Sequence, residues 1–373
     1  MAKKKKKKQL KSLPKGLPEK FLERLERIVG SSLFRDVTDT FIDKPTTFRV
    51  NTLVATRDEV LSYLSSHGYK ISTVAWYSDA FILQNKSKRE LTELDIYRDG
   101  KIYIQSLASQ VPPLVLDPQP GEKILDLTAA PGSKTSQIAA LMQQEGELVA
   151  NELNKIRFFR LKHNMEHLRV MGRVDQPSQE TMSEDAFDEN GDDEHAPAPA
   201  ESTDMAVDFV DTEKKDWTFR LRMEDGSVLS KEYPEYFDKI LVDAPCSGES
   251  RFINGYPKTY GYWSEHKIKQ VAYRQHKLIM AAWSALKPGG VLVYSTCTIA
   301  PEENEQRVAK LLERMGDEAE VEKISIDGLK KLKPILVWKE KEFPKQIEKT
   351  LRIMPTKEIE GFFVARIRKK NIL

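Results

Sequence analysis

Short strand-like segments alternate with helix-like segments after residue 120, and this alternation constrains the fold more than any other feature of the chain. Apolar runs with the length of buried strands lie at 123–127, 147–151, 217–223, 239–242, 290–295 and 361–367. Segments with helical periodicity lie between them at 133–142, 154–170 and 265–286. Such alternation predicts an α/β fold with a doubly wound, mostly parallel sheet.

The chain before this region has a mixed pattern, which predicts a separate small α+β domain over residues 18–100 and a second domain over 101–373. Thr56 and Glu59 have the spacing of a capping box, which begins a helix. The other elements are expected in the order helix 17–30, strand 47–53, strand 71–74, strand 81–83 and, after residue 100, a helix that ends before Pro112.

Charge is distributed unevenly along the chain. Lys3 to Lys8 are consecutive lysines, so residues 1–17 are predicted to form a disordered polybasic tail. Residues 174–216 hold 15 Asp and Glu against 2 Lys and Arg and are predicted to be a disordered acidic insertion. The rest of the chain has 57 Lys and Arg against 42 Asp and Glu. A basic folded part suits a polyanionic partner such as RNA.

Cys246 and Cys297 are the only cysteines, and each follows a predicted buried strand. In open α/β sheets, ligands bind at the carboxyl ends of the strands, which is where both thiols are expected. A lone cysteine is commonly a small buried apolar residue. Polar neighbours such as Asp243, Ser247 and Thr298 favour a chemical role here.

The sequence has no secretory signal and no apolar stretch of about 20 residues, so no membrane partner is expected. A reducing cytoplasm is therefore predicted, which disfavours a disulfide between the two cysteines. No His or further Cys lies at ligand spacing from either of them, so no metal site is predicted.

Residues 125–134, Leu-Asp-Leu-Thr-Ala-Ala-Pro-Gly-Ser-Lys, form a pattern of strand, small-residue turn and helix start. Small residues let a ligand approach the backbone closely, and free amides at a helix start suit polar or anionic groups. The spacing is neither that of a Gly-x-Gly-x-x-Gly motif nor that of a P-loop. Glu152 ends the next strand, where an acidic side chain can hold ribose hydroxyls. Together these features favour an adenosine ligand.

Three motifs occur in a fixed order along the chain. They are Asp-Leu-Thr-Ala-Ala-Pro-Gly-Ser-Lys-Thr at 126–135, Asp-Ala-Pro-Cys-Ser-Gly at 243–248, and Ser-Thr-Cys-Thr at 295–298 with Glu-Glu-Asn-Glu at 302–305. With them the chain resembles the Nop2/Sun (RsmB-like) family of RNA cytosine-C5 methyltransferases. The resemblance covers about residues 20–373, including Arg-Val-Asn-Thr at 49–52 and Gly-Phe-Phe-Val-Ala-Arg at 361–366.

The resemblance implies S-adenosylmethionine as methyl donor. It also implies a Rossmann-like class I methyltransferase domain preceded by a small RNA-recognition-like domain that binds RNA. The residues that would bind the cofactor are Ala129, Ala130, Pro131, Gly132, Ser133, Lys134, Glu152, Asp225 and Asp243. Among them, Glu152 would bind the ribose and Asp225 the adenine side. Thr128 and Ser133 depart from the family pattern, since many members have Cys and Gly there.

The resemblance also implies how the two thiols share the chemistry. Carbon 5 of cytosine attacks a methyl sulfonium poorly unless a thiolate first adds to carbon 6. Cys297 is the attacking thiol in this pattern, and Asp243 would hydrogen-bond nitrogen 3 of the base. Cys246 would act in release of the product. Lys134 would orient Asp243 and the cofactor, or form an ion pair without a catalytic role.

A reacting base must be single-stranded or flipped out of a helix. Aromatic and basic residues that follow the first cysteine are expected to line its approach, namely Arg251, Phe252, Tyr256, Lys258, Tyr260, Tyr262 and Trp263. Ordinary packing is an equal alternative for them.

The sequence leaves other functions open. An RNA-binding ribosome-assembly factor that does not depend on methylation would need the same basic surface. Adenine- and glutamine-directed methyltransferases use an Asn/Asp-Pro-Pro-aromatic loop, whereas this chain has Asp-Ala-Pro-Cys at 243–246. Ribosomal and transfer RNA are both open as substrates. We expect a monomer in the cytoplasm, or in the nucleolus if the organism is a eukaryote.

Overall fold

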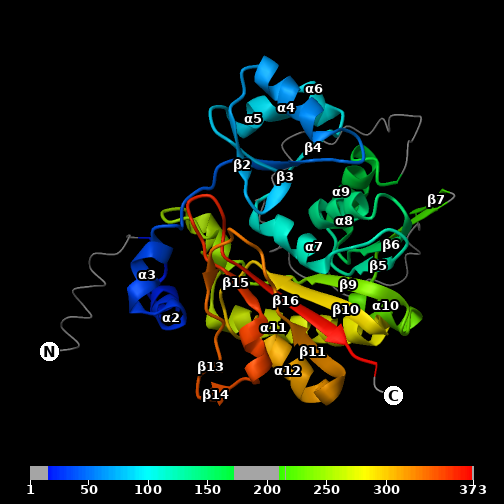
Figure 1. The fold of residues 1–373 in the computed structure, drawn as a ribbon. Helices are drawn as coiled ribbons and strands as arrows, with labels where there is room; N and C mark the ends of the chain where they lie inside the picture. Colours follow the sequence, from blue (N-terminus) through cyan, green and yellow to red (C-terminus); the bar gives the residue numbers. More distant parts are fainter. Residues whose placement is uncertain (1–15, 172–209, 215, 372–373) are drawn as a thin grey trace.

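The structure is a computed structural model that describes residues 16–171, 210–214 and 216–371 (Figure 1). Most of the predicted polybasic tail and acidic insertion, residues 1–15 and 172–209, therefore lies outside the described residues. The predicted limits of both segments are wrong at their C-terminal ends. Leu17 is buried, and residues 210–214 form an edge strand, where charged side chains are tolerated.

Ten strands form the main sheet, and the five central ones run parallel. Their order across the sheet is β10 (Leu286–Thr296), β9 (Phe237–Asp243), β5 (Lys123–Asp126), β6 (Gly146–Asn151) and β8 (Trp217–Arg222). The chain proceeds outward from β5 to β8 on one side and from β9 to β10 on the other. The carboxyl ends of β5 and β9 therefore flank the switch point, where ligands bind in such sheets.

Antiparallel strands complete both edges of this sheet. β7 (Val210–Lys214) pairs with β8, and β16 (Phe362–Lys369) pairs with β10. Three short strands follow β16 at that edge: β11 (Ala319–Glu322), β15 (Leu351–Ile353) and β12 (Lys331–Leu332). A small separate hairpin consists of β13 (Val337–Trp338) and β14 (Lys341–Glu342). The predicted doubly wound, mostly parallel α/β fold is confirmed.

Helices cover both faces of the sheet and define two hydrophobic cores (Figure 1). One core joins the sheet to α7 (Val111–Leu116), α8 (Ser133–Leu141) and α9 (Lys155–His167). The other joins it to α10 (Gly226–Glu232), α11 (Glu265–Ala285) and α12 (Glu305–Met315). Ile124 and Leu125 lie in different cores, as the alternation of side chains along a strand requires.

A four-stranded antiparallel sheet precedes this layered region. Its order is β2 (Ile71–Val74), β3 (Tyr77–Leu83), β1 (Thr47–Val50) and β4 (Ile102–Ile104). Its hydrophobic core includes residues of α4 (Arg57–Ser66), α5 (Lys88–Thr92) and α6 (Asp95–Arg98). The predicted capping box of Thr56 and Glu59 is present at the start of α4.

The helix predicted after residue 100 is wrong. That segment contains strand β4 and then the 3-10 turn η1 (Ala108–Gln110), which leads into α7. Pro112 and Pro113 do not end a helix but lie in the first turn of α7. Proline is tolerated there because the amides of a first turn have no partner within the helix.

The first two helices, α2 (Glu19–Val29) and α3 (Ser31–Thr38), pack beside the segment that follows Cys246. Phe21 contacts Phe252 with ring centroids 5.0 Å apart. The start of the described chain thus lies against the region that carries the thiols. None of the helices in the described ranges is long and apolar enough to cross a membrane.

Candidate active site

The carboxyl ends of four adjacent parallel strands carry the polar residues that the sequence singled out. Asp126 ends β5, Asp243 ends β9, Glu152 follows β6, and Cys297 follows β10. Their strands are neighbours in the order β10, β9, β5 and β6. The predicted cofactor residues and the predicted thiols therefore share one edge of the sheet.

The turn between β5 and α8 is held from behind by helix α9. Arg157 donates to the carbonyl of Ala130 at 2.7 Å, and Asn164 donates to that of Pro131 at 2.8 Å. Gly132 has a φ of +106°, and a Cβ atom there would lie 2.5 Å from Met165 Cε. Glycine suits this position because a side chain would be strained at this positive φ, whereas the flexible end of Met165 could move aside.

Asp126 lies buried beneath this turn with one oxygen engaged. Thr135 Oγ1 donates to its Oδ2 at 2.7 Å, whereas Oδ1 is buried without a hydrogen-bond partner. Burial is the main cause that raises the pKa of Asp126 to about 7, and the negative charge of Asp243 adds to the rise. The hydrogen bond from Thr135 and the positive charge of Lys134 act in the opposite direction. An open buried acceptor beside a backbone cradle fits the ammonium group of an amino-acid ligand, such as the methionine end of S-adenosylmethionine.

Glu152 lies almost buried at the end of β6, and Asp225 is exposed beyond the neighbouring strand β8. Glu152 Oε1 accepts from the Asn154 amide at 2.9 Å, and its Oε2 lies 3.4 Å from Arg157 Nη1. Asp225 caps helix α10 through a hydrogen bond from the Ser227 amide. The two carboxylates lie at adjacent strand ends, so a ligand that crosses this edge can meet both.

Asp243 is held by contacts from three separate segments. Lys134 Nζ lies 2.7 Å from its Oδ2, and Ser295 Oγ donates to its Oδ1 at 2.7 Å. Thr128 Oγ1 donates to its backbone carbonyl at 2.9 Å. Lys134 also donates to Ser109 Oγ at 2.7 Å. The predicted pairing of Lys134 with Asp243 is thus present, and both carboxylate oxygens are fixed in direction.

The two thiols lie next to each other at the ends of β9 and β10. Cys246 Sγ and Cys297 Sγ are 3.2 Å apart and are not joined in a disulfide. Cys246 is buried, while Cys297 is partly exposed. The Ser250 amide donates to the Cys297 carbonyl at 3.1 Å, which ties the two loops together. The more accessible thiol is the one to which the family pattern assigns the attack.

In the aromatic segment after Cys246, some side chains pack in a hydrophobic cluster and others line a cavity. Phe252 and Tyr260 are buried in a cluster with α2 and α3, which favours the packing alternative for them, although Phe252 also borders the cavity that Arg251 and Tyr262 line. They pack because the N-terminal helices, which the sequence did not connect to this segment, supply apolar partners. Arg251 and Tyr262 instead line a cavity of about 250 Å³, together with Lys44 and Lys88.

Sequence analysis missed several residues that shape the site. Ser109 and Ser295 contact the Lys134–Asp243 pair. Ser109 carries no recognisable local signal, whereas Ser295 opens the Ser-Thr-Cys-Thr motif but was given no role of its own. Arg49 connects the N-terminal sheet to the start of α8, where it donates to Ser136 Oγ at 2.5 Å. A buried set of glutamates behind the thiols was also missed, although part of it belongs to the Glu-Glu-Asn-Glu segment at 302–305.

The chain matches a known protein family and several individual relatives. Residues 113–190 and 213–368 match the family described as 16S rRNA methyltransferase RsmB/F. A tRNA (cytosine(49)-C(5))-methyltransferase of Pyrococcus abyssi is 30% identical over 358 residues, which cover 95% of this chain and 97% of the relative. The ribosomal RNA small subunit methyltransferase F of Vibrio vulnificus is 34% identical and matches 95% of this chain. The chain spans 64% of that relative's length.

Solved structures agree in fold along nearly the whole chain. A methyltransferase homologue from Pyrococcus horikoshii superposes with a TM-score of 0.69 at 26% identity, covering 95% of this chain and 100% of the other. NSun6 from the same organism, crystallised with SFG, has a TM-score of 0.70 at 21% identity and covers 95% of this chain and 99% of its own. The chain therefore belongs to the RsmB/F family, the S-adenosylmethionine-dependent RNA (cytosine-C5)-methyltransferases that its motifs resemble.

Proposed function

We propose that this chain methylates carbon 5 of a cytosine in RNA through a covalent adduct between Cys297 and carbon 6. The observation that supports this most is the distance of 3.2 Å between the two thiols, beside a carboxylate fixed by Lys134. A pair of structural cysteines would not need a lysine-bound carboxylate at the neighbouring strand end. The relatives named for transfer RNA and for ribosomal RNA leave both classes as substrates.

The first step is addition of the Cys297 thiolate to carbon 6. A bond forms between Sγ and carbon 6, and the electron pair of the 5,6 double bond becomes available at carbon 5. Nitrogen 3 takes up a proton from solvent as electron density builds on the ring, and its N–H then donates to the Asp243 carboxylate, which stabilises the electron-rich adduct. Lys134 and Ser295 hold the two Asp243 oxygens, so this carboxylate does not have to reorganise during the reaction.

S-adenosylmethionine supplies the electrophilic methyl group to carbon 5. The residues that would hold it are those of the turn 129–134, with Glu152 toward the ribose and Asp225 toward the adenine. The fit rests on the open Asp126 Oδ1 and on the turn 129–134, in which the positive φ of residue 132 favours glycine. Lys134 belongs to this turn and also contacts Asp243, so it would orient both the cofactor and the Asp243 carboxylate.

Release requires that carbon 5 lose its proton and that the bond from Sγ to carbon 6 break, which restores the 5,6 double bond. Cys246 lies next to Cys297 and is assigned this step: in its thiolate form it takes the carbon 5 proton, which it gives up to solvent before the next turnover. The electron pair of the broken carbon–sulfur bond returns to Cys297 as thiolate. The arrangement then allows another turnover.

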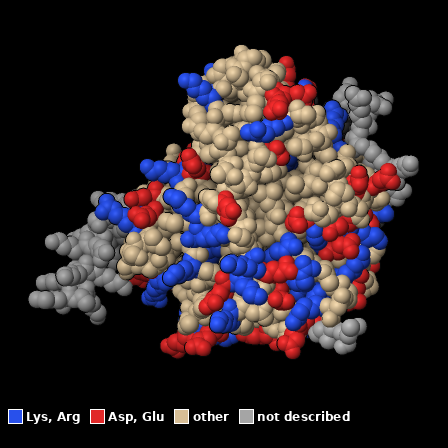
Figure 2. Space-filling model, viewed as in Figure 1, with Lys and Arg blue, Asp and Glu red and all other residues tan. Residues whose placement is uncertain are grey.

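RNA would reach the thiols across the N-terminal region. Residues 18–100 are proposed as the RNA-binding domain, and Arg49 fixes their sheet to the cofactor turn. The cavity lined by Lys44, Lys88 and Arg251 touches the thiol region, since Ser250 lies in its wall. On the face drawn in Figure 2, lysine and arginine are numerous over the lower part of the molecule, among acidic side chains.

The test is trapping of the adduct with total RNA from cells that lack this protein. Cys246→Ala should add to the base, methylate it and then stall, leaving a protein–RNA complex that survives a denaturing gel. Cys246→Ala combined with Cys297→Ala should give no such complex. Bisulfite sequencing of the trapped RNA would identify the cytosine. If the complex accumulates in Cys297→Ala instead, the two thiols have the reverse roles.

A further inference from the structure

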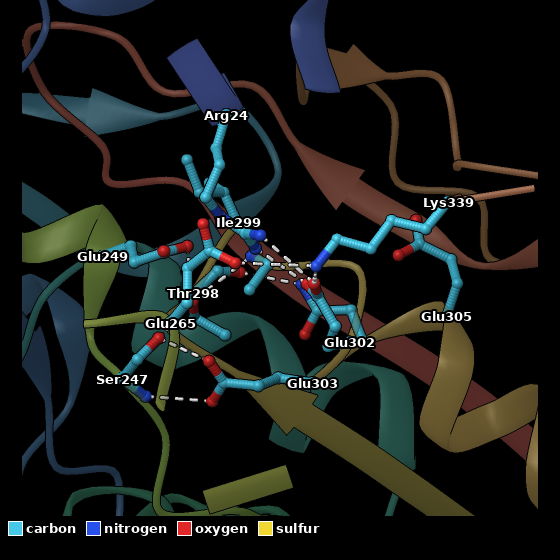
Figure 3. Close-up of polar contacts among 12 residues, drawn as sticks. Arg24, Ser247, Glu249, Glu265, Thr298, Ile299, Glu302, Glu303, Glu305 and Lys339 are labelled. Atoms are coloured by element: carbon cyan, nitrogen blue, oxygen red, sulfur yellow. Dashed lines mark hydrogen bonds and ion pairs between the residues drawn. The ribbon is translucent and has the colours of Figure 1, made fainter. Parts of the chain in front are cut away.

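Behind the thiols, a chain of hydrogen bonds joins the two cysteine loops (Figure 3). Ser247 Oγ lies 2.5 Å from Glu303 Oε1 and 2.8 Å from Thr298 Oγ1. Thr298 Oγ1 lies 2.9 Å from Glu249 Oε2. Ser247 is the residue after Cys246, and Thr298 is the residue after Cys297. The carboxyl groups of Glu249 and Glu303 are buried, so water cannot replace the hydrogen bonds of this series.

The number of protons shared along this series of hydrogen bonds fixes the total charge of the four side chains. Three hydrogen bonds in series need three protons, and the two hydroxyl groups supply only two. The third must therefore belong to one of the carboxyl groups. If Glu303 carries it, Glu303 donates to Ser247, Ser247 donates to Thr298, and Thr298 donates to an ionised Glu249.

The surroundings of the two carboxyl groups distinguish them. Arg24 contributes a positive charge toward Glu249, and Trp263 Nε1 donates to Glu249 Oε1 at 2.7 Å. Glu303 Oε2 accepts from the Ser247 amide and from Gln275 Nε2, both at 2.9 Å. Within the described ranges Glu303 forms no ion pair, although the charge of Arg307 acts on it from a greater distance. Burial raises the pKa of Glu303 to about 8, and nearby Glu249 adds to the rise. Glu303 is thus the group that holds the shared proton.

We propose that protonated Glu303, Ser247 and Thr298 form a positioning unit that holds the two thiols in contact. The hydroxyl groups of Ser247 and Thr298, each next to a cysteine, are hydrogen-bonded to each other. The two cysteine loops therefore cannot separate without breaking a buried hydrogen bond. Neither carboxyl touches the reacting atoms, so these residues act through the position of the thiols. The inference rests on the proposed function, because it assumes that both thiols act on one base.

The N-terminal helix α2 closes the unit from outside. Arg24 donates to both oxygens of Glu302, at 3.2 and 2.8 Å, and Lys339 donates to Glu302 Oε1 at 2.9 Å (Figure 3). Glu302 precedes Glu303, so this pairing anchors the backbone that carries the protonated carboxyl. The packing of α2 therefore contributes to the geometry of the thiols, although α2 lies far from them in the sequence.

Thr298→Val and Thr298→Ser are the matched pair that tests this unit. Valine has nearly the shape of threonine but lacks the hydroxyl that links the loops, whereas serine keeps it. We expect Thr298→Val to lower kcat by on the order of 10²-fold, as a misplaced reacting group does, with KM for RNA and S-adenosylmethionine within about twofold. Thr298→Ser should stay within about threefold of the wild type.

Glu303→Gln tests the shared proton. Its amide can donate to Ser247 Oγ and accept from Gln275 and the Ser247 amide, as the protonated acid does. We therefore expect Glu303→Gln to keep kcat within about threefold of the wild type, and Glu303→Ala to lose about as much as Thr298→Val. Equal losses in Glu303→Gln and Glu303→Ala would show that an ionised carboxylate is required, which would overturn the assignment.

A second readout separates position from activity and needs neither RNA nor cofactor. Diamide oxidises two adjacent thiols to a disulfide, and its rate reports how often Cys246 and Cys297 are in contact. Thr298→Val should slow this reaction at least about tenfold, and Thr298→Ser should not. Unchanged disulfide formation in Thr298→Val would overturn the positioning role. Failure of the proposed function appears separately, as a wild-type protein that forms the disulfide but methylates no RNA.

Glu147→Gln serves as the stability control. Glu147 is a buried carboxyl that accepts from Arg220 and Tyr236, away from the thiols. Its substitution should lower the melting temperature without changing kcat or the rate of disulfide formation. If Thr298→Val does not fold, Ser247→Ala and Glu303→Ala remove the same links and are measured in the same way. If Glu147→Gln slows disulfide formation as much as these variants do, their effect is one of general stability and the positioning role is overturned.

Discussion

The proposed active site, at the carboxyl ends of the parallel strands, has a cofactor half and a thiol half, and the two are built differently. Most of the proposed cofactor half, the turn 129–134 and Glu152, lies within about 30 residues of the sequence, and Asp225 joins it from further along the chain. The thiol half is formed by residues more than 50 positions apart, and Arg24 joins it from almost 280 positions away. The cofactor half is therefore largely a property of local sequence. The thiol half exists only when distant segments have packed.

The electrostatics of the two halves differ as well. At the cofactor half, charged groups meet in ion pairs such as Arg157 with Glu152. Behind the thiols, Glu302 and Glu303 are adjacent yet opposite in character. Burial would raise the pKa of Glu302, but hydrogen bonds and charge from Arg24 outweigh it and lower this pKa to about 2. Glu303 has no such partner, and its pKa rises to about 8.

The largest expected effect separates chemistry from cofactor binding. Cys297→Ser should reduce methylation by at least about 10³-fold, because an alcohol is a far weaker nucleophile than a thiolate at neutral pH. The affinity for S-adenosylmethionine should be unchanged within about twofold, since the thiol lies outside the cofactor turn. Methyl transfer assays and calorimetric titration measure the two quantities. Cofactor binding lost together with activity would show that the two halves are not independent.

A smaller effect is expected where the halves meet. Lys134→Met removes the ammonium group that lies 2.7 Å from Asp243 and leaves a side chain of similar length. We expect kcat to fall by about 10²-fold, which is typical for loss of one preorganised electrostatic contact. Cofactor affinity should fall by less than kcat does. Single-turnover methylation under saturating cofactor makes this distinction, and an unchanged rate would leave Lys134 as an ion pair without a catalytic role.

Within the cofactor half, Glu152 should matter more than Asp225. Glu152→Gln should weaken S-adenosylmethionine binding about tenfold, or about 1.4 kcal/mol, because it removes a charged acceptor for the ribose hydroxyls. Asp225→Asn should weaken it about threefold, because this side chain is exposed and already caps α10. Equilibrium titration of each variant with the cofactor checks the order. A greater loss in Asp225→Asn would reverse the predicted contributions.

The smallest effects concern stability against pH and should have opposite signs for the two glutamates. The folded-state pKa of Glu303 lies above its ordinary value of 4.5, so its contribution to stability is present below about 4.5 and is lost as pH rises toward about 8. The folded-state pKa of Glu302 lies below 4.5, so its contribution is present above 4.5 and is lost as pH falls toward about 2.

Urea unfolding of the wild type, Glu302→Gln and Glu303→Gln between pH 4 and pH 8.5 measures these contributions. The advantage of the wild type over Glu303→Gln should shrink as pH rises. Its advantage over Glu302→Gln should shrink at the acidic end. Parallel curves for both variants would contradict the difference in ionisation that separates the two carboxyl groups.

The fold was largely predictable because its signals are local. Buried parallel strands are continuous apolar runs, and the capping box at Thr56 needs only four residues. The prediction failed after residue 100, where prolines that suit a first helical turn were interpreted as the end of a helix. Edge strand β7 was missed because its charged residues resemble the acidic segment before it.

The sequence by itself determined the α/β architecture, the cofactor turn and the two cysteine motifs, because each depends on residues that are neighbours in the chain. Only the tertiary structure decided what surrounds them. Ser295 meets Asp243 across two strands, and Phe252 is buried because α2 covers it. Burial in the folded chain, together with nearby Glu249, raises the pKa of Glu303 to about 8. Local patterns do not carry this information, since burial and charge pairing arise from segments that meet only in the folded chain.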